Sequence, residues 1–179
     1  MKKRNVLKWI IFGIALAINI FIIVNSFITG DASTAESNAV INTTANVVNS
    51  LSPGLVTSSN FNNFVGLIRK LFGHFGLFAI SGLITTWSLY LFLKGQKHGY
   101  FLDIIGISFL DGLVVAWVSE FVQLFVPGRS GSAADVLIDM IGYFIGVLLV
   151  ILILFLAKKP IFSKIEQEEK WVVDGSLFY

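Results

Sequence analysis

The chain of 179 residues is 55% hydrophobic and only 13% charged, with a mean hydropathy of +0.81 and a net charge of +2. This balance excludes an ordinary soluble domain and predicts an integral membrane protein. The sequence has no cysteine, which excludes disulfides and thiolate metal sites, and it has no basic patch of the kind that binds nucleic acid.

Four apolar segments are long enough to cross a bilayer as helices: residues 9–28, 71–93, 104–126 and 134–157. The first follows a basic start, so a cleaved signal peptide is the competing interpretation. Its apolar stretch is longer than an ordinary signal core, and residues 30–33 make a poor cleavage site, which favours an uncleaved anchor. We therefore predict an all-α integral membrane protein built as a bundle of four transmembrane helices.

Basic residues are unevenly distributed around these spans. If both termini are cytoplasmic, nine basic residues share that side: Lys2, Lys3, Arg4, Lys8, Lys94, Lys97, Lys158, Lys159 and Lys164. The positive-inside rule therefore predicts a multi-pass protein with both termini in the cytoplasm. Arg69, Lys70 and Arg129 lie against this trend on the opposite side, which marks them as candidates for function.

A polar extracellular segment, residues 31–68, separates the first two spans and is rich in Ser, Thr, Asn and Ala. Four of its apolar residues recur at helical spacing: Val40, Val47, Val48 and Leu51. They indicate a short amphipathic helix lying on the outer membrane face and ending at residues 52–54, with a disordered polar loop as the alternative. Apolar residues from Phe61 to Ile68 predict a helix that continues into the second span. Residues 158–179 read as a cytoplasmic tail.

Polar side chains recur near the outer end of each of the three spans in the core, residues 69–157. They are Lys70 and His74 on the second span, Glu120 and Gln123 on the third, and Asp135 and Asp139 on the fourth. The members of each pair are three or four residues apart and share a helix face. A carboxylate in hydrocarbon costs at least ~2.5–3.5 kcal/mol, so we expect these groups to meet and pair in one outward-facing pocket.

The neighbouring residues add to this pocket or explain parts of it. Arg69 and the turn residues Arg129 and Ser130 lie at the same level and complete the predicted binding set. Some of these residues also have a structural explanation. Ser132 and Asp135 match a helix capping box, and the alternative role for Arg129 is contact with lipid phosphate at the membrane surface. Close approach of the second and fourth spans is expected at five glycines: Gly73, Gly76, Gly82, Gly142 and Gly146. Asp111, about half a turn around the helix from Glu120, is expected outside the pocket and paired elsewhere.

These residues give the chain a resemblance to the VanZ-like family of bacterial membrane proteins, over about residues 69–150. The matching pieces are Arg69-Lys70 before His74-Phe75, Glu120-x-x-Gln123, Pro127-Gly128-Arg129-Ser130, Asp135 with Asp139, and Gly142-x-x-x-Gly146. Ser119 and Val122 stand where many relatives carry Asp and His, and Asp139 stands where many carry Asn. The resemblance implies a bacterial plasma-membrane protein and a contribution to tolerance of teicoplanin-type glycopeptides.

Three functions are compatible with this sequence. The leading hypothesis is a non-enzymatic protein whose pocket binds an anionic headgroup or an envelope lipid, with the bilayer and that lipid as partners. The alternative is an intramembrane enzyme acting on a lipid or lipid-linked substrate, with His74, Glu120 and Asp135 as catalytic candidates. No cofactor is evident, but a divalent metal fits four of the residues: His74, Glu120, Asp135 and Asp139. A proton or ion carrier ranks third, because its path would need Asp111.

Overall fold

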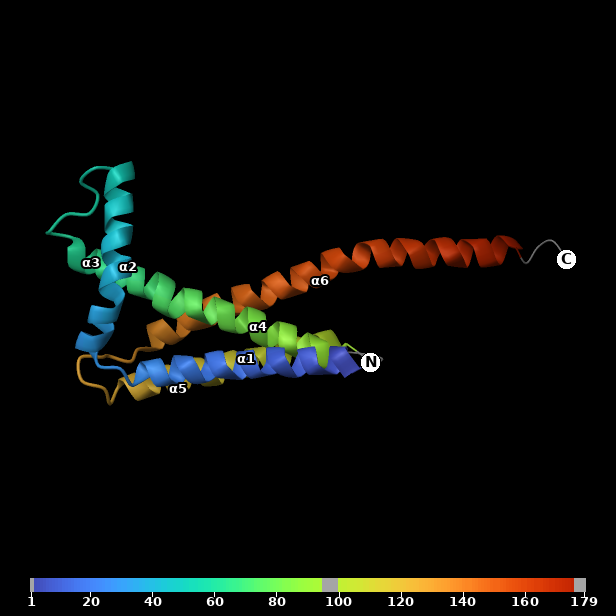
Figure 1. Ribbon diagram of the computed structural model, residues 1–179, viewed down its shortest axis with the longest axis horizontal. Helices are drawn as coiled ribbons and strands as arrows, with labels where there is room; N and C mark the ends of the chain where they lie inside the picture. The colour runs from blue at the N-terminus through green and yellow to red at the C-terminus, as the bar shows by residue number, and fades with distance from the viewer. Residues whose placement is uncertain (1, 95–99, 176–179) are drawn as a thin grey trace.

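The computed structural model describes residues 2–94 and 100–175, which are helical apart from short connections (Figure 1). The elements are α1 (Lys2–Ser26), α2 (Gly30–Leu51), α3 (Phe61–Ile68), the π-helical segment η1 (Arg69–Gly76), α4 (Leu77–Leu93), α5 (Tyr100–Gln123) and α6 (Ala133–Gly175). Four helices are long and apolar enough to cross a membrane: Val6–Ser26, Phe61–Leu93, Phe101–Gln123 and Ala133–Ala157. The prediction of an all-α bundle with four spans is confirmed.

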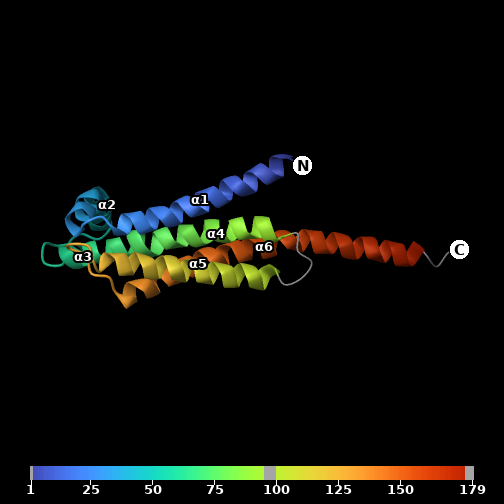
Figure 2. The ribbon, with the colours of Figure 1, turned by 90° about the horizontal axis from the view of Figure 1, so that it is seen from below.

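The four spans lie side by side, and their ends sort into two groups. Figures 1 and 2 show the start of α1 and the far end of α6 on one side of the bundle, with α2, α3 and the turn between α5 and α6 on the other. We call this second side the α2 end. The two termini therefore share one side, as the basic residues predict. Lys97 and the last four residues of the tail, 176–179, lie outside the described residues.

The second span is one continuous helical segment from Phe61 to Leu93, which confirms that the helix starts well before the apolar core of the span. Its middle part, η1, has the wide turns of a π-helix, which the sequence pattern did not predict. π-Helical segments are rare in proteins, and many of those that occur lie at functional sites. Here η1 carries Lys70 and His74.

Glycines bring α4 and η1 into backbone contact with α6. A Cβ atom would collide with a carbonyl group of the facing helix at three positions: Gly82 against Tyr143, Gly142 against Phe75, and Gly146 against Ala79. The predicted close approach is right for these three glycines. It is wrong for Gly73, which faces open space, and for Gly76, whose near neighbour belongs to its own helix segment.

The polar segment after α1 is a longer helix than its apolar residues indicate. α2 begins at Gly30, directly after Thr29, whose hydroxyl accepts the Ala32 N–H at 3.4 Å. It ends at Leu51, close to the predicted stop, and Figure 1 shows it crossing the end of the bundle instead of running along it. Two of its apolar residues, Ile41 and Ala45, are buried. Three of the apolar residues that predicted a membrane-facing side are exposed: Val40, Val47 and Leu51.

The turn between α5 and α6 anchors the start of α2. α5 ends at Gln123, three residues before the predicted end of the span, because turn hydrogen bonds replace helical ones from Leu124 onward. Gly128 then adopts φ +73°, a conformation that favours glycine. The Pro127 carbonyl accepts the Gly30 N–H at 3.1 Å, and a Cβ atom at Gly30 would collide with the Gly128 carbonyl.

Candidate polar site at the α2 end

Two parallel contacts join η1 to α6. Lys70 Nζ lies 2.9 Å from Asp135 Oδ1, and one turn further along both helices His74 Nδ1 lies 3.1 Å from Asp139 Oδ1. The residues in each helix are four apart, so the two contacts form consecutive rungs between segments that run in the same direction. The structure thus brings four of the predicted site residues together as two cross-helix pairs, an ion pair between Lys70 and Asp135 and a hydrogen bond between His74 and Asp139.

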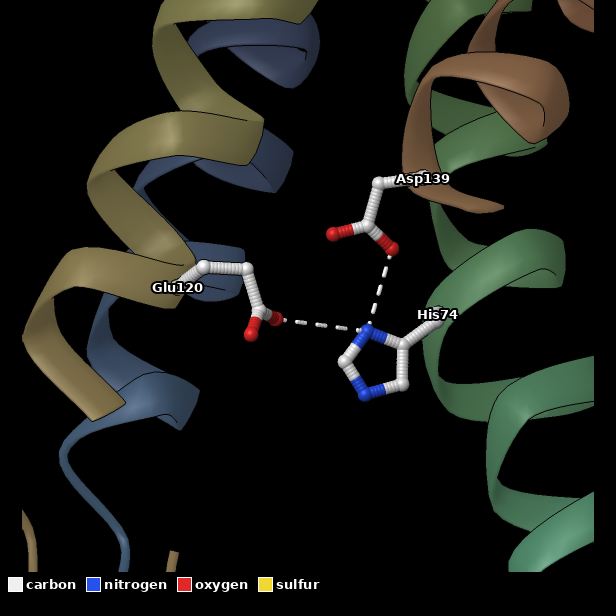
Figure 3. A group of neighbouring side chains, drawn as sticks. All are labelled: His74, Glu120 and Asp139. Carbon is white, nitrogen blue, oxygen red and sulfur yellow. Dashed lines mark hydrogen bonds and ion pairs between the residues drawn. The ribbon is translucent and has the colours of Figure 1, made fainter. Parts of the chain in front are cut away.

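Glu120 approaches the second rung from α5. Its Oε1 lies 3.6 Å from His74 Nδ1, on the side of the ring that also faces Asp139 (Figure 3). Gln123 donates its side-chain N–H to Glu120 Oε1 at 3.1 Å, and the Ser132 backbone N–H is donated to Glu120 Oε2 at 2.9 Å. Glu120 is only 4% exposed, so these two donors stabilise a carboxylate that water scarcely reaches.

The predicted capping box at the start of α6 is present in a modified form. Ser132 Oγ accepts the Asp135 N–H at 3.1 Å, as in an ordinary capping box. The side chain of Asp135, however, accepts the Ser132 hydroxyl at 2.9 Å instead of the Ser132 backbone N–H. That N–H is donated to Glu120, so the cap of α6 also fixes a side chain of α5.

A cavity of about 610 Å³ opens at the α2 end, between α1, α2, η1 and the turn after α5. Seven of the nine predicted binding residues line it: Arg69, Lys70, His74, Gln123, Arg129, Ser130 and Asp135. The other two, Glu120 and Asp139, lie behind His74 and are buried. His74 therefore separates the cavity from a carboxylate pair beneath it.

Arg129 is held by the end of α1. Its Nε donates to the carbonyl of Ile28, which follows α1, at 3.1 Å. Its Nη2 donates at 3.5 Å to the carbonyl of Asn25, in the last turn of α1, which also accepts the Ile28 N–H at 3.2 Å. Burial and the positive charge of Arg69 lower the pKa of the Arg129 guanidinium. A guanidinium remains charged at physiological pH even so, and the cavity thus holds two like charges close together.

Asp111 lies in a separate polar network in the middle of the bundle. It accepts hydrogen bonds from Asn19 Nδ2, at 3.1 Å to each carboxylate oxygen, and from Tyr143 Oη at 2.7 Å. Ser81 Oγ donates to Asn19 Oδ1 at 2.6 Å, so the network takes one residue from each of the four spans. Asp111 is therefore paired elsewhere, as expected from its helix face.

Among the residues that the structure describes, one group has the donor atoms and spacing to hold a metal ion. His74, Glu120 and Asp139 each offer one ligand atom, and these atoms lie within 4.8 Å of one another. Asp135, the fourth candidate ligand from the sequence, is instead held by Lys70 and Ser132. Because of these contacts, Asp135 is less available to act as a general base. The other two catalytic candidates, His74 and Glu120, lie next to each other.

The sequence pattern missed the contribution of α2 and α1. Ser33, Glu36 and Ser37 of α2 line the cavity, although nothing in their spacing signals a site. Asn19 of α1, which belongs to the mid-bundle network, could have been predicted to have a polar partner, because it is the single polar residue in the apolar run 9–24.

Comparison with known proteins gives one match. A model of the VanZ/LLP1 family matches residues 9–155, which include every residue of the site and all four spans except the first three residues of the first and the last two of the fourth. No curated protein and no solved structure matches the chain.

Proposed function

The chain belongs to the VanZ/LLP1 family of membrane proteins, and we propose that its cavity binds the anionic headgroup of a cell-envelope lipid from the outer side of the bacterial plasma membrane. Binding of this headgroup would change how teicoplanin-type glycopeptides engage the cell surface. The single observation that carries this proposal is the clustering of Arg69, Lys70 and Arg129 around one cavity.

The charge of this cavity favours an anion over a cation. Of the three basic residues, Lys70 is paired with Asp135, and it remains half exposed toward the cavity. Arg129 uses two of its five N–H donors on the carbonyl groups of Asn25 and Ile28, which leaves donors for a ligand. A phosphate accepts charge-assisted hydrogen bonds from such groups in the geometry that arginine prefers.

The cavity also has an apolar wall, which suits a lipid better than a free anion. Five apolar side chains from α1, η1 and α4 line it: Phe21, Ile22, Phe72, Leu77 and Phe78. Phe72 is 55% exposed, so this wall continues onto the side of the bundle that faces hydrocarbon. A headgroup among the basic residues would place its acyl chains along this wall.

Lipid retention by the purified protein tests the proposal. Native mass spectrometry of the protein with phosphatidylglycerol or phosphatidylcholine should show selective retention of the anionic lipid. Lys70→Gln and Arg129→Gln should each weaken retention by about 10- to 150-fold, since a hydrogen bond to a charged group is worth about 1.5–3 kcal/mol.

Two matched variants separate charge from folding in this experiment. Arg129→Lys keeps the charge and should retain more lipid than Arg129→Gln. Lys8→Gln makes the same change as Lys70→Gln on α1, at the end of the bundle away from the cavity, and should retain lipid normally. Equal retention of both lipids, or no difference between Lys8→Gln and Lys70→Gln, would contradict headgroup binding.

The link to antibiotics needs its own measurement. Cells that express Lys70→Gln at the level of the unmodified protein should lose teicoplanin tolerance, while Lys8→Gln should preserve it. Unchanged tolerance in both would separate the lipid site from any antibiotic phenotype.

A second candidate function is an intramembrane enzyme acting on a lipid or lipid-linked substrate. The observation that favours it is the placement of His74 at the cavity wall with two buried carboxylates on its Nδ1 side. A carboxylate that orients one nitrogen of an imidazole prepares the other nitrogen for proton transfer. Turnover of a labelled lipid that is lost in Glu120→Gln would support this function, and its absence would leave headgroup binding.

A further inference from the structure

Three potential metal ligands from three different helices converge behind the cavity wall. His74 on η1, Glu120 on α5 and Asp139 on α6 contribute Nδ1, Oε1 and Oδ1, with Nδ1 at 3.1 Å from Asp139 and 3.6 Å from Glu120. Nitrogen and oxygen ligands around one tetrahedral zinc ion lie about 3.3–3.5 Å apart, given metal–ligand bonds of about 2.0–2.2 Å. Both observed distances are close to this spacing.

Hydrogen bonds alone leave this cluster incompletely satisfied. His74 Nδ1 carries at most one proton and can donate it to only one of the two carboxylates, of which Asp139 is nearer. Asp139 is fully buried, and its Oδ2 has no hydrogen-bond partner among the described residues. In Figure 3 this second oxygen points toward the helix that carries Glu120.

An unpartnered carboxylate oxygen at this depth is unusual, because buried charge is normally paired or bound to a cation. The second carboxylate, Glu120, increases the negative charge at the same point. A positive ion between the three side chains would balance this charge, and coordination by both oxygens of Asp139 would give Oδ2 the partner that it lacks.

We propose that His74, Glu120 and Asp139 bind one divalent transition-metal ion, with Zn²⁺ as the best fit. An imidazole with two carboxylates suits Zn²⁺, whereas Mg²⁺ and Ca²⁺ favour oxygen ligands throughout. Gln123 and the Ser132 N–H already orient Glu120, as the outer hydrogen bonds of metal sites orient their ligands. Three protein ligands leave a coordination position for water or a ligand oxygen.

Zn²⁺ binding here does not require that the cavity binds a headgroup, and its test is separate. The full chain is purified in detergent, and EDTA is used to remove any bound metal. After dialysis against Zn²⁺, the zinc content per protein is measured by inductively coupled plasma mass spectrometry. One equivalent is expected in the unmodified protein, and His74→Ala and Asp139→Asn should retain less than about a tenth of it. Asp135→Asn is the matched control, because it removes a carboxylate one turn away that Lys70 holds, and it should keep the full equivalent.

Thermal unfolding distinguishes loss of the site from loss of the fold. Zn²⁺ should raise the melting temperature of the stripped protein, since a ligand that binds only the folded state stabilises it. Asp139→Asn, which is nearly isosteric, should elute as a monodisperse peak and show no rise with Zn²⁺. The proposal is overturned if the stripped unmodified protein takes up no zinc, or if folded Asp139→Asn and His74→Ala bind as much as it does.

Discussion

The backbone N–H of Ser132 lies 2.9 Å from Glu120 Oε2 and is donated to it. This hydrogen bond joins the start of α6 to a side chain three residues before the end of α5, across the turn that lines the cavity. The start of a helix carries partial positive charge, so it favours the carboxylates of both Glu120 and Asp135. The local backbone thereby offsets part of the cost of placing these acids within a membrane span.

The first prediction concerns Gln123, the other donor to Glu120. Gln123→Leu keeps the size of the side chain but removes its N–H group, so one oxygen of a buried carboxylate loses its partner. We expect an unfolding free energy lower by about 1–3 kcal/mol, measured by thermal or denaturant unfolding in detergent. Zn²⁺ affinity should fall about tenfold, because an outer hydrogen bond to a ligand is lost.

A lipid-facing neighbour provides the control for this change. Phe121→Leu alters a residue of the same helix that is 57% exposed, and it should change neither stability nor zinc affinity measurably. If Gln123→Leu behaves like Phe121→Leu, the hydrogen bond to Glu120 has no energetic role.

The second prediction concerns the contact between η1 and α6. Gly142→Ala would place a methyl group against the Phe75 carbonyl and separate the two segments, which also moves His74 away from Asp139. We expect a loss of about 1–3 kcal/mol in stability, as for other overpacked contacts, together with weaker zinc binding. Gly106→Ala is the control, because a Cβ atom there meets nothing within 4 Å, and it should be neutral or slightly stabilising.

The third prediction separates the mid-bundle network from the site. Tyr143→Phe removes the hydroxyl that donates to Asp111 Oδ2 and should cost about 1–3 kcal/mol of stability. Asp111 is nine residues, or about 13 Å of helix, from Glu120, so zinc and lipid binding should persist in the folded variant. Proton flux into proteoliposomes should not depend on Asp111, and flux lost in Asp111→Asn would instead support a carrier.

Periodicity and the cost of buried charge were sufficient to predict the four spans and that polar residues of three of them lie close together. Lys70 with His74, and Asp135 with Asp139, are each four residues apart, and this spacing alone places each pair on one helix face. Because the two helices run in the same direction and both pairs have the same spacing, each residue of one pair can contact a residue of the other. The choice of partner was not predictable, because it depends on the rotation of each helix about its axis.

Three features depend on tertiary structure that the sequence does not encode locally. The π-helical turns of η1, which packs against α6, leave no mark in the hydrophobic pattern. Arg129 was expected to meet an anion, yet part of its guanidinium binds the carbonyl groups of Asn25 and Ile28, more than a hundred residues away in the chain. The separation of Asp135 from the possible metal ligands likewise depends on Lys70, which the sequence alone cannot place.

The fourth prediction concerns which side of the membrane the cavity faces. The chain has no cysteine, so single cysteines report on topology without background. Ser59→Cys, between α2 and α3, should react with a membrane-impermeant maleimide on intact cells, and Lys94→Cys, just after α4, should react only after permeabilisation. The positive-inside rule requires this result. The reverse labelling would place the cavity at the cytoplasmic leaflet, where its headgroup would come from the inner lipids and an antibiotic outside the cell would not meet it.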